Sequence, residues 1–360
     1  MNRRTTIRDI AQKAGCHYST VSLALRNEVE IGEKTRGKIQ RLAREMGYCP
    51  DPMLRALAAY RTMNKPAHYH ATLAWLTNAN EPLSHTSRKY LRGAQARAEQ
   101  LGYKIEEFRV CGPDMRPERL PRILRARAIS GLLVPPQPSP NRTQAEIRMD
   151  WSSLSAVAFG YSLAWPSLHL VVNNQHRSAK LAVQKLAEMG HRRIGLVVDD
   201  VANERTDGNW SGGYMAEVIR RQLAPQIFFR RSGDSMTLLS AEEAPRLKAW
   251  LKKNKPEALI IDYSPPFIDW LRGTCGLRVP EDISVVSLNV DHPSYSGIDQ
   301  NEHEGGMAAV DFLVQLLHTN ERGIPAIPRR LLIEGTWCDG KTVCAAVPKG
   351  GSRKKQLTTK

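Results

Sequence analysis

The sequence has few cysteines, and their spacing suggests neither a metal site nor a disulfide framework. The six cysteines are scattered, and no Cys-x-x-Cys pair occurs among Cys16, Cys49, Cys111, Cys275, Cys338 and Cys344. A reducing cytoplasm suits such a chain. The amino terminus lacks the apolar segment of a secretory signal, and no apolar run approaches the ~18 residues of a membrane span. We therefore expect a cytoplasmic protein without a membrane partner.

Groupings of catalytic residue types are missing as well. Asp199 and Asp200 follow an apolar run, where turn and capping roles are common, and neither a nucleophile motif nor a phosphate loop accompanies them. His68 and His70 lie in a polar stretch without a nearby carboxylate or thiolate ligand. The sequence predicts that the protein is not an enzyme and has no catalytic residue, no metal and no cofactor.

Positive charge is concentrated near the two ends of the chain. The formal net charge is +16, of which residues 1–61 carry +6 and residues 340–360 hold six cations and no acid. A basic head that attracts phosphate, joined to a nearly balanced body, indicates a DNA-binding module attached to a second unit. We interpret residues 341–360 as a disordered basic tail that either adds nonspecific DNA affinity or improves solubility.

The first sixty residues contain three apolar repeats with helical spacing. The first covers residues 7–14, and Gly15 can end it in the left-handed conformation. A second helix from Tyr18 to Arg26 starts two residues after the turn, which is helix-turn-helix spacing. A third repeat, at residues 39–46, ends before Gly47. The alternative is an ordinary charged three-helix bundle.

The stretch after the third repeat predicts a short hinge helix. Asp51 can cap a helix, and Pro52 suits its first position. The roughly nine residues from Pro52 to Tyr60 are fewer than the ~12 to 15 that an isolated helix needs, so DNA or a partner subunit should stabilise it. A plain linker helix is the alternative.

The phrases TIRDIAQKAG, STVS and TRGKIQRLAREMGY resemble the headpiece of the LacI/GalR family of bacterial transcription regulators. The resemblance implies a headpiece over residues 1–48 and a hinge over residues 49–69. It also implies a homodimer on a pseudo-palindromic double-stranded DNA operator, with Leu57 wedged into the minor groove. The expected DNA-contacting residues are Thr6, Tyr18, Ser19, Thr20, Ser22, Leu23, Arg26, Arg55 and Leu57. His17, Leu23 and Leu54 depart from the family pattern, so the operator sequence is not readable.

From residue 71 onward, apolar runs alternate with amphipathic stretches, which predicts parallel α/β sheets. The expected strands are residues 71–77, 104–110, 131–136, 156–160, 169–173, 193–199, 226–231, 258–262, 283–289 and 330–335. The phrases AEMGHRRIGLV, GLRVPEDISVVSLNVD and GIDQNEHEGGMAAVDFLVQLL resemble the family's regulatory domain, which is similar to periplasmic sugar-binding proteins. The expected fold is therefore an all-α three-helix helix-turn-helix headpiece plus an α/β two-lobed periplasmic-binding-protein-like domain.

The resemblance assigns residues 70–340 to an effector-binding and dimerisation domain. The first lobe takes residues 70 to about 171 and 300–335, and the second takes residues 172–299. Because ligands bind at the carboxyl ends of parallel strands, polar residues at these ends predict an effector site. They are Asn78, Asn80, Tyr161, Asn209, Trp210, Asp262, Tyr263 and Asn289. Trp210 stands where the family commonly has an arginine, and Tyr263, Ser264, Asn289 and Asn173 also depart from its pattern. A carbohydrate or related effector is expected, and a standard hexose is doubtful.

The sequence thus predicts a DNA-binding regulator, in the family's commoner case a repressor, controlled by a small effector between two lobes. An effector-independent or protein-controlled regulator is one alternative. A solute-binding protein or receptor without DNA function is another, and an enzyme of sugar metabolism fused to a DNA-binding head is a third.

Overall fold

A computed structural model describes residues 5–25, 31–48, 71–77, 84–109, 119–137, 145–231, 242–262 and 265–346. The headpiece and the α/β body are each described separately below. The predicted hinge helix, with Leu54, Arg55 and Leu57, lies outside the described residues. No helix in the described ranges is long and apolar enough to cross a membrane.

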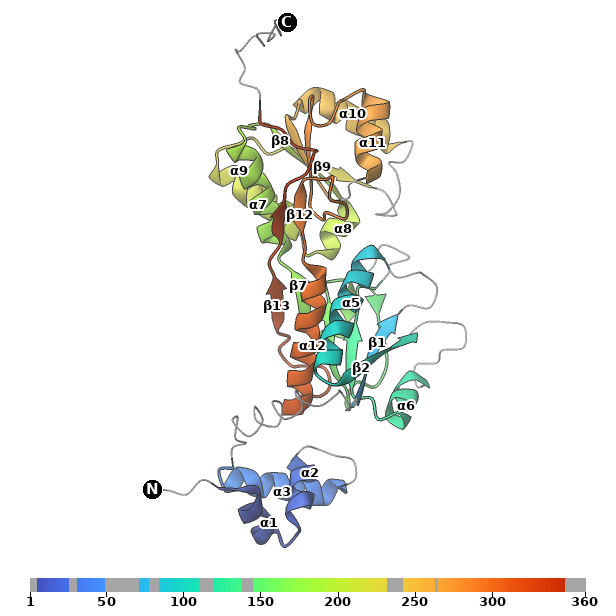
Figure 1. Cartoon of the computed structure of the whole chain (residues 1–360), viewed down its shortest axis with the longest axis vertical. Helices are drawn as coiled ribbons and strands as arrows, with labels where there is room; N and C mark the ends of the chain where they lie inside the picture. The colour runs from blue at the N-terminus through green and yellow to red at the C-terminus, as the bar shows by residue number, and fades with distance from the viewer. Residues whose placement is uncertain are drawn as a thin grey trace, which may run out of the picture.

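The headpiece consists of α1 (Ile7–Ala14), α2 (Tyr18–Leu25) and α3 (Glu33–Glu45) (Figure 1). Their shared core is small, and half of its fully buried residues are alanine: Ile10, Ala11, Val21, Ala24, Ile39 and Ala43. Polar contacts connect the helices at their ends. Gln40 Nε2 donates to the Ala24 carbonyl at 3.0 Å, and Thr5 Oγ1 donates to the Met46 carbonyl at 2.8 Å.

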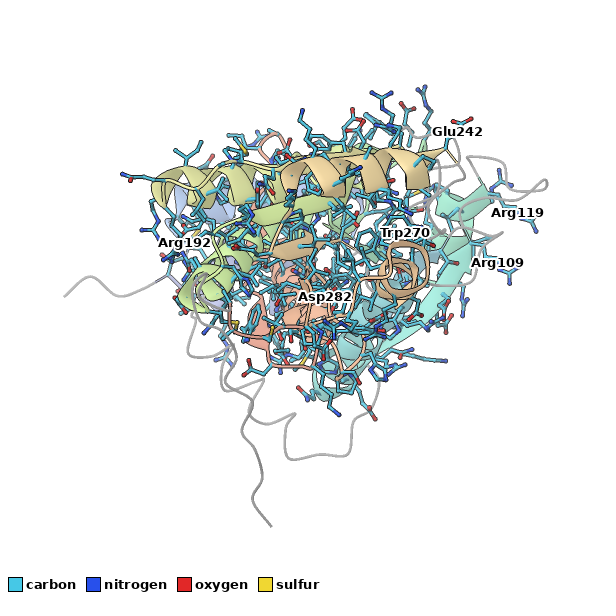
Figure 2. The ribbon with its side chains drawn as sticks, turned by 90° about the horizontal axis from the view of Figure 1, so that it is seen from above. Arg109, Arg119, Arg192, Glu242, Trp270 and Asp282 are labelled. Carbon is cyan, nitrogen blue, oxygen red and sulfur yellow. The ribbon has the colours of Figure 1, made fainter. Side chains whose placement is uncertain are left out.

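The first lobe contains a six-stranded parallel sheet with the order β13-β7-β5-β3-β1-β2. Its strands are β1 (Ala71–Thr77), β2 (Tyr103–Arg109), β3 (Gly131–Val134), β5 (Ser155–Phe159), β7 (His169–Asn173) and β13 (Arg330–Ile333). One core cluster joins the sheet to α5 (His85–Gln100) and α12 (Glu302–Thr319), and another joins it to α6 (Arg119–Ala126). The short strands β4 (Ala145–Glu146) and β6 (Leu163–Trp165) form a separate pair. In the view from above, Arg109 and Arg119 project outward at the edge of the molecule (Figure 2).

The second lobe contains a six-stranded sheet with the order β14-β12-β11-β10-β8-β9. Its strands are β8 (Ile194–Asp199), β9 (Ile227–Arg230), β10 (Ala258–Ile261), β11 (Ser284–Ser287), β12 (Gly297–Asp299) and β14 (Thr336–Cys338). Residues of α7 (Gln175–Glu188) and α9 (Asn209–Arg220) share one core cluster with the sheet. Residues of α10 (Glu243–Asn254) and α11 (Pro265–Cys275) share the other. The six-residue helix α8 (Asp200–Arg205) directly follows β8.

The chain passes between the two sheets three times (Figure 1). The passages run from β7 to α7, from β12 to α12 and from β13 to β14. A polar chain connects two of them, because Tyr90 Oη donates to Asn173 Oδ1 and Asn173 Nδ2 donates to the Gln300 carbonyl. Gln300 Nε2 then donates to the Leu288 carbonyl at the end of β11. The lobes are therefore joined by hydrogen bonds as well as by the chain.

The predicted fold class is confirmed. All ten expected strands are present, with ends that differ by at most two residues. The expected strand over residues 330–335 ends earlier, at Ile333, because the chain leaves the first sheet there and enters the second as β14. Gly335 makes this passage possible, since a Cβ at residue 335 would lie 2.5 Å from Ile298 Cγ2.

The expectation of a disordered tail from residue 341 is wrong for residues 341–346. Thr342 is buried, and its Oγ1 donates to the Val285 carbonyl at 2.7 Å. The Cys344 N–H donates to Ser284 Oγ at 3.1 Å. These residues lie along β11, where they satisfy backbone groups of the second lobe. Residues 347–360 lie outside the described residues.

Candidate DNA-binding surface and interlobe site

The turn between α1 and α2 is held by groups that the local sequence supplies. Thr6 caps α1 in a reciprocal arrangement: its Oγ1 accepts from the Asp9 N–H at 3.3 Å, while Asp9 Oδ2 accepts from the Thr6 N–H at 2.7 Å. Gly15 ends the helix with a φ of 69°, a conformation that costs a glycine no steric strain. Thr6 therefore has a structural role, besides its predicted contact with DNA.

His17 stands at the start of α2, where its side chain takes over the role of a capping hydroxyl. Its Nδ1 lies 2.7 Å from Ser19 Oγ and accepts a longer hydrogen bond, 3.4 Å, from the Ser19 N–H. Its carbonyl accepts from the Thr20 N–H at 3.0 Å. His17, which departs from the family pattern, thus provides a hydrogen-bond acceptor at the amino terminus of the helix.

The outward face of α2 carries the side chains that the sequence predicts for base and phosphate contacts. Tyr18 is 52% exposed, and Ser19 is also exposed. Thr20, Ser22 and Leu23 are half-buried. Val21 and Ala24 face the core, so packing against α1 and α3 fixes the orientation of the exposed face. Arg26 lies outside the described residues.

Only some of the predicted effector residues are available to face a ligand. Trp210 is a correction: its ring is 8% exposed and packs with apolar residues of α7 and β8 in the core of the second lobe. Little of its ring is therefore left to stack on a ligand. Asn209 Nδ2 donates to the Thr206 carbonyl at 2.6 Å, which is a local contact. Tyr161 packs under the guanidinium of Arg330, with 5.2 Å from Arg330 Cζ to the ring centroid. Asn78, Asn80 and Tyr263 lie outside the described residues.

Asp262 and Asn289 follow two neighbouring strands, β10 and β11, at the same edge of the second sheet. Asp262 Oδ2 accepts from the Asp199 N–H at 2.7 Å, and burial raises the pKa of Asp262 to about 6. The hydrogen bond from Asp199 opposes this shift. Asn289 Oδ1 is buried without a hydrogen-bond partner among the described residues. A buried acceptor without a partner costs free energy, so Asn289 Oδ1 would gain from a donor that reaches it.

Sequence reasoning missed a contact that joins the carboxyl ends of the two sheets. Arg205, at the end of α8, donates from Nη2 to the Gln137 carbonyl at 2.5 Å. Gln137 lies three residues after β3 of the first lobe, and its N–H donates to Ser162 Oγ at 2.8 Å. Arg205 follows a predicted strand by six residues, so a wider search of the strand ends would have included it.

Asp199 has the capping role that the sequence favours over catalysis. Its Oδ1 accepts from the Ala202 N–H at 3.0 Å, which starts α8 and so positions Arg205. No group of three or more His, Cys, Asp or Glu side chains in the described ranges has a geometry that could hold a metal ion.

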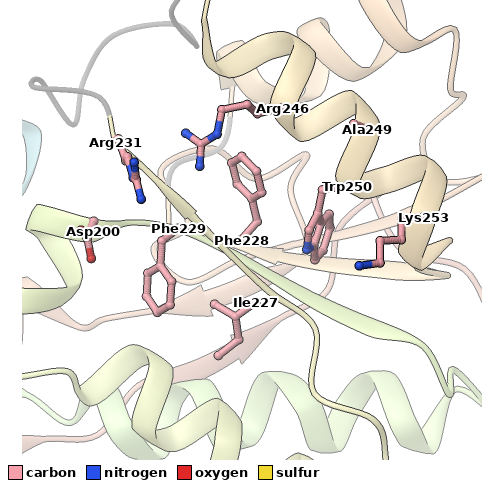
Figure 3. Close-up of a pocket in the computed structure, with 9 residues that line it drawn as sticks. All are labelled: Asp200, Ile227, Phe228, Phe229, Arg231, Arg246, Ala249, Trp250 and Lys253. Atoms are coloured by element: carbon pink, nitrogen blue, oxygen red, sulfur yellow. The ribbon is translucent and has the colours of Figure 1, made fainter.

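A separate hollow of about 640 Å³ lies on β9, the edge strand of the second sheet (Figure 3). Phe228 and Phe229 point to opposite sides of the strand, and Arg246, Trp250 and Lys253 contribute from α10. None of the sequence-predicted effector residues lines this hollow. The interlobe contact of Arg205, by contrast, joins the carboxyl ends of the sheets, where ligands of this fold bind.

The fold, the exposed face of α2 and the interlobe contact of Arg205 define a class of protein. It has a helix-turn-helix DNA-binding domain attached to a two-lobed domain of the ligand-binding type. Residues 6–51 match the family model described as bacterial regulatory proteins, lacI family. Residues 183–343 match the periplasmic binding protein-like domain. The chain thus combines a lacI-family DNA-binding domain with a periplasmic-binding-protein-like domain.

Relatives of similar length support this assignment. The chain is 24% identical to the HTH-type transcriptional repressor CytR of Escherichia coli (strain K12) over 331 residues, which is 88% of this chain and 91% of the relative. It is 23% identical to the lactose operon repressor of the same strain over 322 residues, 86% of this chain and 84% of the relative.

Solved structures show the same fold. The lac repressor dimer bound to operator and the anti-inducer ONPF has a TM-score of 0.54 and 19% identity, covering 95% of this chain and all of that chain. The complex of the regulator CelR with cellobiose has a TM-score of 0.52 and 18% identity, covering 94% of this chain and all of the other.

Proposed function

We propose that this protein is a transcriptional repressor that binds a pseudo-palindromic DNA operator as a homodimer and is released or retained by a small effector. The observation that carries the proposal is the exposed polar face of α2, fixed by a small core on a basic three-helix unit. The amino-terminal residues of such a helix can reach base edges in the major groove. The proposal includes a cytoplasmic location and no catalytic step.

The body is suited to converting ligand binding into a change at the DNA. Its lobes are joined by three passages of the chain and by the contact of Arg205 with Gln137, so a ligand that binds one lobe arrangement more tightly shifts the population toward it. The hinge helix that the sequence predicts for residues 52–60 would be too short to be stable alone, so its formation would depend on how the two bodies of the dimer hold it. Similarity to a CelR complex with cellobiose and to a LacI-family regulator with bound ribose supports a carbohydrate or related effector.

A DNA-binding measurement on the full chain tests the proposal. We expect a salt-sensitive complex in a mobility-shift assay with the DNA upstream of the chain's own gene, because phosphate contacts release counterions. Leu57→Ala should weaken the complex by removing the predicted wedge, whereas Leu332→Ala, at a leucine of β13 that is 49% exposed, should leave it unchanged. Equal DNA binding by the fragment 70–360 would contradict the proposal, and so would turnover of a sugar by the full chain.

A further inference from the structure

Arg205 is a cation that the described residues leave largely uncompensated. Its guanidinium carries five N–H donors, and the structure pairs one of its nitrogens, Nη2, with the Gln137 carbonyl. Its Nε is buried and has no acceptor in the described part of the chain. The side chain is half-buried, so water replaces only some of these missing partners. The guanidinium of Arg205 is thus held in place, and most of its N–H groups have no acceptor among the described residues.

Several other arginines of the body face carboxylates. Arg193 lies 2.7 Å from Glu257, and Arg329 lies 2.5 Å from Glu321. Arg205 has no carboxylate within ion-pair distance in the described ranges, and burial lowers the pKa of its guanidinium without a compensating acid. Burying a charge is costly unless it is paired. A half-buried guanidinium without an acid partner among the described residues is suited to bind an anion from solution.

The surroundings of Arg205 are those of a ligand site. The residue follows β8, and its partner Gln137 follows β3, so the guanidinium lies at the carboxyl ends of strands from both sheets. Gln137 is itself fixed, because its N–H donates to Ser162 Oγ at 2.8 Å and its Nε2 donates to the Pro135 carbonyl at 2.7 Å. A rigid carbonyl that engages Nη2 orients the remaining donors of the guanidinium.

We propose that the interlobe site takes an effector that carries an oxyanion, a carboxylate or a phosphate, and that Arg205 binds this group. The planar guanidinium matches such oxyanions with two parallel hydrogen bonds. The ligand then supplies the missing negative charge and contacts Arg205 beside its bond to the first lobe. This inference rests on the proposed effector control and names the chemical class of the effector.

Calorimetric titration of the full chain with matched pairs of ligands tests the inference. Each pair contains an anion and its uncharged counterpart: glucose 6-phosphate and ribose 5-phosphate against the free sugars, gluconate against glucose, and a dicarboxylate against its diamide. Inorganic phosphate tests the isolated group. We expect at least one anion to bind at least ~10-fold more tightly than its counterpart. The phosphate and carboxylate arms identify which oxyanion the site prefers.

Variants then connect the binding to Arg205. Arg205→Gln should abolish the preference for the anion, and Arg205→Lys should retain part of it because the charge stays while the fork is lost. Arg148→Gln is the matched control, since Arg148 is 78% exposed and, among the described residues, pairs with Glu146 at the surface of the first lobe. Melting temperatures without ligand establish that the variants are folded.

The outcomes separate this inference from the proposed function. Tighter binding of an uncharged ligand, with no effect of Arg205→Gln, would overturn the oxyanion inference and leave effector control standing. Binding of an anion that is equally strong in Arg205→Gln would also overturn it. Binding of neither class would overturn the inference together with effector control, while the DNA-binding assay would still decide whether the protein is a regulator.

Discussion

The small core of the headpiece makes DNA binding sensitive to two isoleucines. Ile10 is 0% exposed and Ile39 is 1% exposed, and the rest of this core contains alanines and one valine. Replacing both by alanine should unfold the headpiece. The body should keep its stability, because the core clusters of the two lobes contain no residue of the headpiece.

The size of the effect follows from burial. Each Ile→Ala change removes three carbon atoms, about 2.4 kcal/mol at ~0.8 kcal/mol per methylene, and the cavity that remains brings the usual cost to about 2–5 kcal/mol. The two together cost roughly 4–10 kcal/mol if they add. A unit the length of residues 5–48 has a stability of roughly 2–7 kcal/mol. With mid-range values the folded fraction of the headpiece falls to about 1–2%, which weakens DNA binding about 70-fold.

Fluorescence anisotropy with upstream DNA measures the affinity, and differential scanning calorimetry measures the unfolding of the body. Ile39→Ala alone should give a smaller loss of affinity than the double variant. Ile219→Ala is the control, because Ile219 is 62% exposed on α9. If the double variant keeps wild-type affinity for DNA, binding does not depend on the packed headpiece, and the assignment of the reading head to α1–α3 is wrong.

Three further predictions concern the second lobe. Hydrogen bonds from Arg220, with a smaller part from Arg221, lower the pKa of the buried Glu217 from 4.5 to about 2, so its stabilisation is present above pH 4.5 and lost as the pH falls toward 2. Because Arg220 is exposed, we expect this pH-dependent part of the free energy of unfolding to be about 1–2 kcal/mol. Urea unfolding at a series of pH values measures it, and it should be absent in Glu217→Gln. Burial raises the pKa of Asp262 from 3.8 to about 6, so stability should instead rise as the pH falls from about 6 to 4, and Asp262→Asn should be about 1–3 kcal/mol more stable at pH 7. Gly213→Ala should cost at least ~3 kcal/mol, because a Cβ there would lie 2.1 Å from the His176 carbonyl oxygen, and a change in melting temperature below ~2 °C would contradict this.

Local patterns predicted most of the secondary structure for a physical reason. The strands of parallel sheets are buried on both faces, so their sequences are continuous apolar runs. Such runs predict β1, β8 and β10. Strands β12 and β14 have three residues each and no such run. Their pairing depends on where the chain passes between the lobes, which a local pattern does not contain.

The helix-turn-helix unit could be predicted from the sequence alone, because the interactions that define it join residues close together in the chain. The spacing of apolar residues, the reciprocal cap of Thr6 and Asp9 and the left-handed Gly15 all act within a few residues of one another. The exposed face of α2 follows directly from that spacing.

The effector site was decided by the tertiary structure. A strand-end position made Trp210 look like a ligand contact, but packing between α7 and α9 buries its ring in the core. Arg205 and Gln137 are far apart in the sequence and belong to different lobes, and they meet because both follow the carboxyl ends of strands. Whether a polar residue at a strand end caps a helix, fills a core or faces a ligand depends on what packs against it from the other lobe, and that is a property of the assembled chain.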